Sequence, residues 1–205
     1  MQGSISLFSL FMLGGPVMWP LLALLVAVTV IIVERTVLFV RADLRVAQGA
    51  KASLDIYKTQ GKEEALRFCE DPENIWGKAV STALDCQGGC TRAMGLARIQ
   101  GSETIMRLER PLSYLDMIAS VAPILGFLGT VTGMISAFKS IAEANTVQLQ
   151  LVAAGLYEAL FTTAFGLIIA IIATIAAHVF RQIIDTYEIE QETALATVET
   201  VLRLN

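Results

Sequence analysis

Hydrophobic and polar positions are unevenly distributed along this chain. Long apolar runs cover residues 16–40, 112–138 and 149–180, and nearly all charged residues lie between or after these runs. Each run exceeds the roughly 20 residues that a helix needs to cross a hydrocarbon core about 30 Å thick. The pattern therefore predicts an all-α integral membrane protein with three transmembrane helices.

The segments outside the runs have the periodicity of amphipathic helices. Residues 41–111 carry apolar residues at helical spacing, with breaks at Gly61, Asp71-Pro72 and Gly88-Gly89, and predict a helical bundle continuous with the spans. The tail 181–205 has one apolar stripe on an acidic helix, formed by Ile184, Tyr187, Leu195, Val198 and Leu202. Such a stripe requires a partner helix, either in the same bundle or in a neighbouring copy of the chain.

The distribution of positive charge predicts the orientation in the membrane. Of the 15 lysines and arginines, only Lys139 lies outside residues 35–110 and 181–205. Three spans place these two segments on the same side, which the positive-inside rule makes the cytoplasm. Basic residues near the inner interface are expected to contact anionic lipid. They are Arg35, Arg41, Arg45, Arg107 and Arg110.

The two remaining segments are expected on the outer side. Residues 139–148 form a short external loop in this interpretation. Residues 1–15 have no basic start of the kind that signal peptides carry, so they are expected to stay on the protein as an external interfacial segment.

Composition agrees with a membrane protein and limits the chemistry. The chain of 205 residues is 55% hydrophobic and 17% charged, which is too apolar for one soluble domain. Its three cysteines fall in the predicted cytoplasmic part, where thiols stay reduced. Cys86 and Cys90 lack the CxxC spacing of zinc modules, and the single histidine, His178, is far away in sequence. No metal, cofactor or nucleic-acid partner is expected.

The second run has a face of small residues. On a helix, Gly126, Thr130, Gly133 and Ala137 share this face with Asp116, Ala119 and Pro123, and Gly129 lies beside it. Small residues give no packing advantage against lipid, whereas they allow a second helix to approach closely. The pattern predicts a helix-packing seam formed by Pro123, Gly126, Gly129, Gly133 and Ala137.

The third run contains one acidic residue, Glu158. A carboxylate at membrane depth costs a few kcal/mol, so it should be protonated, paired or turned to a polar interior. Thr162 lies one turn along on the same face, whereas Thr163 is displaced by roughly 140°. Two interpretations remain open: a polar passage lined by Glu158 and Thr162, or a structural Glu158 bonded to a neighbouring helix. Because three spans with a single acid deep in the membrane cannot enclose a path, a passage requires further chains.

The second and third runs also resemble a known pair of helices. IASVAPILGFLGTVTGMISAF (118–138) and LVAAGLYEALFTTAFGL (151–167) are similar to the paired signature of the MotA/TolQ/ExbB proton channel family. GGPVMWPLL followed by VER, and LERPLSYLDMIA, resemble the parts that flank it, while residues 46–100 match weakly. One span, a cytoplasmic insert, two spans and a short tail resemble the ExbB and TolQ branch rather than the four-span MotA type.

The resemblance implies a function in the bacterial inner membrane, with the N-terminus periplasmic and the C-terminus cytoplasmic. It implies a homopentamer whose second and third helices surround a pore that holds the single-span helices of an ExbD- or TolR-like dimer. Proton motive force would then drive a TonB- or TolA-like protein. The family pattern places Thr130, Glu158 and Thr163 on the proton pathway, whereas simple geometry favours Thr162 over Thr163. ExbB-type uptake and TolQ-type envelope maintenance both stay open.

Two rival classes fit the sequence less well. An intramembrane enzyme would draw on Ser120, Asp116 or His178, but no serine sits in a GxS elbow and an aspartyl mechanism needs two buried acids. The chain is therefore not expected to be an enzyme. The second rival is a membrane scaffold in which the seam and Glu158 serve assembly alone.

Overall fold

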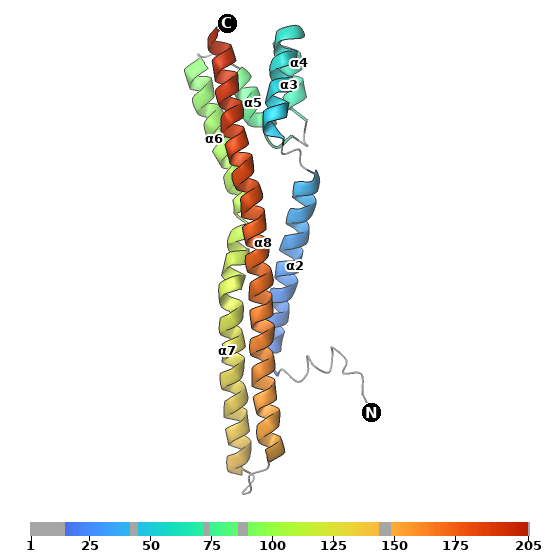
Figure 1. Ribbon diagram of the computed structural model, residues 1–205, viewed down its shortest axis with the longest axis vertical. Coiled ribbons are helices and arrows are strands. Elements are labelled where there is room, and N and C mark those ends of the chain that lie inside the picture. The colour runs from blue at the N-terminus through green and yellow to red at the C-terminus, as the bar shows by residue number, and fades with distance from the viewer. Residues whose placement is uncertain (1–14, 42–44, 72–73, 86–89, 144–148, 205) are drawn as a thin grey trace. The chain divides into compact units, whose positions relative to one another are not determined.

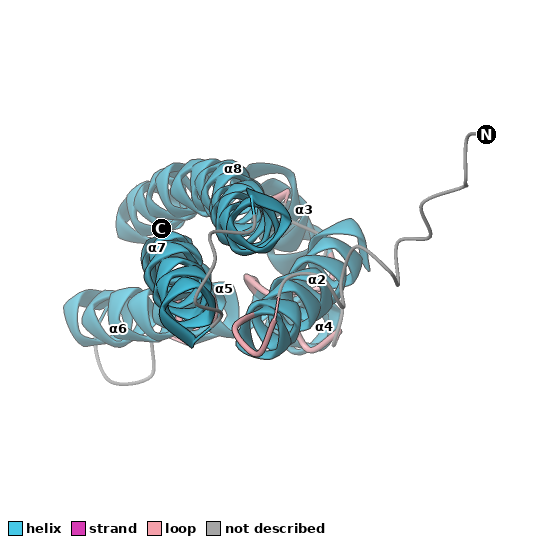
Figure 2. Ribbon diagram, turned by 90° about the horizontal axis from the view of Figure 1, so that it is seen from below, coloured by secondary structure: helices cyan, strands magenta, loops and turns pink. Residues whose placement is uncertain are grey.

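The computed structural model describes residues 15–41, 45–71, 74–85, 90–143 and 149–204. Within these ranges every regular element is a helix (Figure 1, Figure 2). The helices are α2 (Met18–Arg41), α3 (Val46–Thr59), α4 (Lys62–Cys69), α5 (Gly77–Leu84), α6 (Cys90–Glu109), α7 (Leu112–Glu143) and α8 (Leu149–Leu204). The expected interfacial segment, except for its last residue, and the second half of the expected external loop, residues 144–148, lie outside the described residues.

Among the residues that the structure describes, three stretches of helix are long and apolar enough to cross a membrane. They fall within residues 18–59, 91–142 and 155–202, which contain α2, α7 except its last residue, and most of α8. At most 33% of any of their most apolar windows is buried inside the chain, so most of this surface is left for lipid or for other chains. The predicted all-helical class and the three long apolar helices are confirmed.

Contacts divide the chain into two compact units. The first comprises Met1–Ile32 and Ser113–Ala177, and the second comprises Val33–Leu112 and His178–Asn205. The division falls inside α2 and α8, so each of these two helices gives its N-terminal part to the first unit and its C-terminal part to the second. The predicted functional side chains therefore belong to the first unit, apart from the arginines.

The first unit is built from the apolar parts of α2, α7 and α8. Leu21 and Val28 of α2 are fully buried, as are Ala122 of α7 and Ile169 of α8. Pro123 lies inside α7 without ending it, which is common in membrane helices because neighbouring groups satisfy the freed carbonyl. Large apolar side chains on the other faces of α7 and α8 stay exposed, among them Ile124, Phe127, Phe138, Leu160 and Ile171.

The second unit contains the short helices. In chain order, α3 packs on α4, α4 on α5, and α5 on α6. Its largest buried side chain is Trp76, for which Gly49 of α3 leaves room: a methyl group at Gly49 would overlap the indole ring. The predicted break between α3 and α4 falls at Gly61, whose φ of +97° favours glycine.

The apolar stripe on the C-terminal part of α8 is buried within the same chain. Ile184, Tyr187, Leu195 and Val198 are each at most 2% exposed. On the α6 side, Gly101 gives space to the Gln191 side chain of α8, and Arg98 Nη2 lies 3.6 Å from Glu199 Oε2. Of the two partners that the sequence left open, the structure shows the one inside the chain's own bundle.

Candidate functional site

The site begins with the close approach of α7 and α8 in the first unit. Methyl groups built at Gly133 and Gly155 would lie 2.9 Å from Gly155 O and 2.7 Å from Ala137 Cβ, closer than real Cβ contacts. At Gly126 a methyl group would lie 3.0 Å from Thr163 Cα. The two backbones are therefore so near that a side chain at several of these positions would force the helices to shift, which is the geometry that small residues allow in membrane helix pairs.

Two adjacent threonines of α8 lie over this seam. Thr162 is fully buried and donates its hydroxyl proton to Ala159 O at 2.8 Å. Thr163 is half-buried, and its Oγ1 donates across the seam to Gly126 O at 3.0 Å, with Ala159 O at 3.4 Å as the alternative acceptor. Thr162 Oγ1 lies 3.5 Å from the same Gly126 carbonyl. The Gly126 carbonyl is thus the point at which both hydroxyls meet α7.

Glu158 lies one turn before Thr162 on α8 and is half-buried. Its carboxylate contacts Gly15, the residue that opens the turn before α2. Thr162 instead faces Gly129 of α7, where an added methyl group would lie 2.6 Å from Thr162 Cβ. The two side chains that helical geometry places on one side of α8 therefore face different segments of the first unit: Glu158 faces the turn before α2, and Thr162 faces α7.

Thr130 occupies the edge of the seam. Its side chain is half-buried, and its Oγ1 donates to Phe127 O of its own helix at 2.7 Å. Neighbouring Phe127 and Leu128 are exposed, while Gly129 is buried against α8. The hydroxyl therefore stands between the helix contact and the open face of α7. Pro123 is likewise half-buried, and the buried seam comprises Gly126, Gly129, Gly133 and Ala137.

The helices that carry this site match a known family. Residues 88–193 match the MotA/TolQ/ExbB proton channel family, and this range includes all of α7 and most of α8. The match spans more than half of the chain. The chain belongs to this family of proton channels.

Several named relatives of this proton channel chain lie in its ExbB and TolQ branch. A Synechocystis protein named as a biopolymer transport protein, ExbB-like 3, is 27% identical over 84% of this chain and 83% of its own length. TolQ of the Haemophilus influenzae Tol-Pal system is 43% identical over 43% of this chain, and ExbB of Salmonella typhimurium is 40% identical over 40%. The matched parts cover only 37% and 33% of these two proteins.

Four of the five arginines expected at the inner interface of this family member are exposed. They are Arg41, Arg45, Arg107 and Arg110. Arg107 Nη2 pairs with Glu103 Oε1 at 2.6 Å within α6. Arg35 differs: it is 6% exposed, and its Nη1 donates to Leu108 O at 3.4 Å in the last turn of α6. A cation is favourable at a helix C-terminus, so Arg35 acts inside the second unit and not on a lipid surface.

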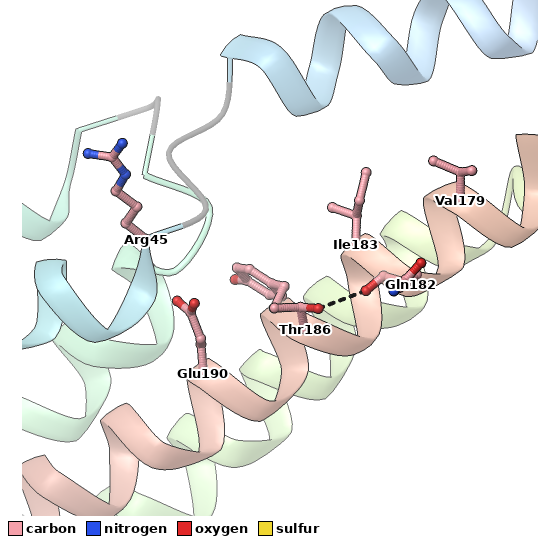
Figure 3. A pocket seen from close by; sticks show the side chains of 7 residues that line it. Arg45, Val179, Gln182, Ile183, Thr186 and Glu190 are labelled. Carbon is pink, nitrogen blue, oxygen red and sulfur yellow. Dashed lines mark hydrogen bonds between the residues drawn. The ribbon is translucent and has the colours of Figure 1, made fainter.

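Arg45 also lines a hollow of about 410 Å³ in the second unit (Figure 3). The opposite wall is α8, where Val179 and Ile183 give an apolar side and Glu190 extends a carboxylate. Thr186 does not bond across the hollow, because its Oγ1 donates to Gln182 O of its own helix at 2.9 Å. The wall of α8 is thus apolar at one end and acidic at the other.

The residues proposed for an enzyme do not form a catalytic group. Ser120 Oγ donates to the backbone carbonyl of Asp116 at 3.0 Å, inside α7, and both residues are exposed. His178 begins the α8 portion of the second unit and is exposed as well. A nucleophile needs a base within hydrogen-bond reach, and the serine hydroxyl instead bonds to a backbone carbonyl.

Sequence reasoning missed the half of the seam that α8 contributes. Gly155, Ala159 and Gly166 repeat at spacings of four and seven residues and meet α7 directly. The signal was present, because the same test for small residues applied to the third run finds this stripe beside the threonines. Gly15 was also missed as a neighbour of Glu158, since no local pattern relates two residues this far apart in sequence.

Proposed function

We propose that the chain is the channel-forming subunit of an inner-membrane complex that couples the proton motive force to mechanical work. The partner is an ExbD- or TolR-like single-span protein, and the complex acts on a TonB- or TolA-like protein. In this proposal the N-terminus is periplasmic and the C-terminus cytoplasmic, because all lysines and arginines except Lys139 lie within residues 35–110 and 181–205. Five copies around a partner dimer give the assembly that the family resemblance implies.

One observation carries the proposal. The apolar α7 and α8 pair holds Thr130, Glu158 and Thr163 half-buried at the edges of a glycine seam. Polar groups at membrane depth cost several kcal/mol when they have no partner, so they are found at ion and proton pathways or at helix contacts. A polar group at the edge of the seam can hydrogen-bond to the paired helix on one side and to a neighbouring chain on the other.

The single chain supports assembly for a second reason. The outer faces of α7 and α8 carry exposed Phe127, Ile135, Phe138 and Leu160, each more than 60% exposed. Lipid covers some of these faces. A path for protons, however, must be closed on all sides against lipid, and three spans cannot do this. Further copies of the chain are needed to enclose Thr130 and Thr163.

The test is a reconstitution with graded variants. The chain is co-expressed with an ExbD- or TolR-like single-span protein, the mass of the complex is measured by native mass spectrometry, and proton flux into vesicles is followed with a pH-sensitive dye. We expect five copies with two partner chains, and proton flux that depends on the partner. Thr163→Val should lower the flux by about tenfold or more, whereas Thr163→Ser, which keeps the hydroxyl, should stay within about threefold of the parent.

The scaffold alternative gives a different pattern. Thr162 and Thr163 both bond to backbone carbonyls at the seam, which is what a purely structural role requires. In that case Thr163→Val and Glu158→Gln would change the stability of the complex. The phenotype of these variants would not depend on the single-span partner, and uncouplers would not change it. A chain that stays a monomer or dimer and does not bind the single-span protein would contradict the enclosed pathway.

A further inference from the structure

We propose that Gly15 is a positioning residue for Glu158, so that the first span helps to set the geometry of the proton pathway. The inference rests on the proposed function, in which Glu158 belongs to that pathway. It joins two residues that lie 143 positions apart in sequence and meet in the first unit. Its basis is a contact, a backbone conformation and an anchored turn.

The contact leaves no room for a side chain at position 15. A methyl group built on Gly15 would overlap Glu158 Oε1 and would lie 3.0 Å from Glu158 Cδ. The glutamate carboxylate thus rests on bare backbone. The overlapping atom is the far end of a flexible side chain, so an added methyl group would displace the carboxylate before it displaced either helix.

The turn that carries Gly15 is held in place. Met18 N–H donates to Gly15 O at 3.2 Å, and Pro16 has a fixed φ at the entry to α2. Val17 and Met18, directly after it, are 9% and 1% exposed. Because these buried side chains anchor the turn, the backbone at Gly15 cannot retreat from Glu158, and the position of the carboxylate is set by the turn.

The backbone conformation offers a competing explanation. Gly15 has a φ of +63°, a region that favours glycine whatever surrounds it. Gly61 provides the matched control, because its φ is +97° and a methyl group there would meet nothing within 4 Å. An alanine at Gly61 imposes the strained φ alone, whereas an alanine at Gly15 imposes both strain and the overlap with Glu158.

The first measurement does not depend on transport. Dicyclohexylcarbodiimide labels membrane carboxyl groups, and mass spectrometry gives its rate of addition to Glu158 in the full chain in vesicles. We expect Gly15→Ala to raise this rate by about fivefold or more, the lower end of resolvable couplings between sites, because the carboxylate is moved off the turn. Gly61→Ala should leave the rate unchanged. An unchanged rate in Gly15→Ala would overturn the proposal.

The second measurement is proton flux in the complex with the single-span partner. Gly15→Ala should lower flux by about tenfold or more, the scale on which small displacements of positioned groups act, and Gly61→Ala should not. Glu158→Asp shortens the side chain by one methylene and withdraws it from position 15. On that background the added methyl group should change flux by less than about twofold.

The outcomes separate this proposal from the proposed function. If Gly15→Ala lowers proton flux equally in the parent and in the Glu158→Asp background, the methyl group acts through the turn. The proposal that Gly15 positions Glu158 is then wrong. If labelling of Glu158 changes but flux in Gly15→Ala equals the parent, Glu158 is not positioned for the pathway. A parent complex with no proton flux refutes the proposed function, and the labelling rates still decide whether Gly15 places the carboxylate.

Discussion

The glycine seam makes a prediction whose size can be worked from the structure. In Gly166→Ala, the new methyl group would lie 2.5 Å from Ala122 O and 3.2 Å from Gly126 Cα. Both atoms belong to the backbone of α7, so no side-chain rotation relieves the overlap. The two helices must move apart, which loosens the whole run of close contacts between them.

Two effects of opposite sign decide the result. Overpacking of a well-packed contact costs about 1–3 kcal/mol, and alanine gains about 1 kcal/mol over glycine inside a helix. Gly166→Ala should therefore destabilise by about 0–2 kcal/mol. Gly95 of α6 is the control, because a methyl group there meets nothing within 4 Å. Gly95→Ala should stabilise by up to about 1 kcal/mol, so the two variants should differ by about 1–3 kcal/mol.

The assay is reversible unfolding of the purified chain, by titration of dodecylmaltoside micelles with sodium dodecyl sulfate and circular dichroism. Because the described elements of both units are helices, loss of helicity in either unit is recorded. A Gly166→Ala variant that is as stable as Gly95→Ala would show that α7 and α8 separate at no cost. The close seam would then not be a determinant of the fold.

Three further predictions concern the second unit. Tyr187→Phe should leave stability unchanged or raise it by up to about 1 kcal/mol, because the buried hydroxyl has no partner among the described atoms; a loss in chemical unfolding would contradict this. Arg35→Met should cost about 1–2 kcal/mol in the same assay through loss of the bond to Leu108 O. Burial raises the pKa of the Cys69 thiol, partly offset by its bond to Ser53. Its contribution to stability is thus present below the unfolded pKa of about 8.5 and lost as pH rises through the folded pKa, a slope that Cys69→Ala should remove.

The sequence contains enough to predict the three apolar helices and part of their contact. The thickness of the bilayer sets the length of the apolar run at about 20 residues. Small residues at membrane depth have few uses other than helix contact. Gly126, Gly133 and Ala137 were identified on these grounds, and they face α8 at close range. Both arguments depend on the environment of a helix and not on its neighbours in sequence.

Helical periodicity alone could not decide between Thr162 and Thr163. The angle from Glu158 favours Thr162, but the structure turns Glu158 toward Gly15 and Thr162 toward Gly129. Both threonines reach the Gly126 carbonyl, because the backbones of α7 and α8 come close together at Gly126. Which hydroxyl matters depends on how two helices cross, and no single-helix period contains that information.

Charge counting predicted sidedness but not contacts. The positive-inside rule reports how many cations a segment has, and it treats Arg35 like the exposed Arg41 and Arg110. Arg35 is buried because the end of α6 brings the Leu108 carbonyl within its reach. A residue 73 positions away supplies that acceptor, which is why local sequence gives no signal for it.

The hydrogen bonds of the site restrict what it can do for a proton. Thr130 and Thr163 each give their only hydroxyl proton to a backbone carbonyl, Phe127 O and Gly126 O. Their oxygens remain acceptors. In the proposed complex they can therefore accept a hydrogen bond from a protonated carboxyl group of the partner. They can donate to an ionised carboxylate only if the hydroxyl first gives up its hydrogen bond to the backbone carbonyl. Thr163 has a second acceptor, Ala159 O at 3.4 Å, on its own helix. A turn of its hydroxyl toward that carbonyl would break the hydrogen bond to α7 and leave the oxygen an acceptor in either position. In the proposed complex, Thr163 could therefore exchange a bond between helices for one within α8 and still accept a hydrogen bond from the partner.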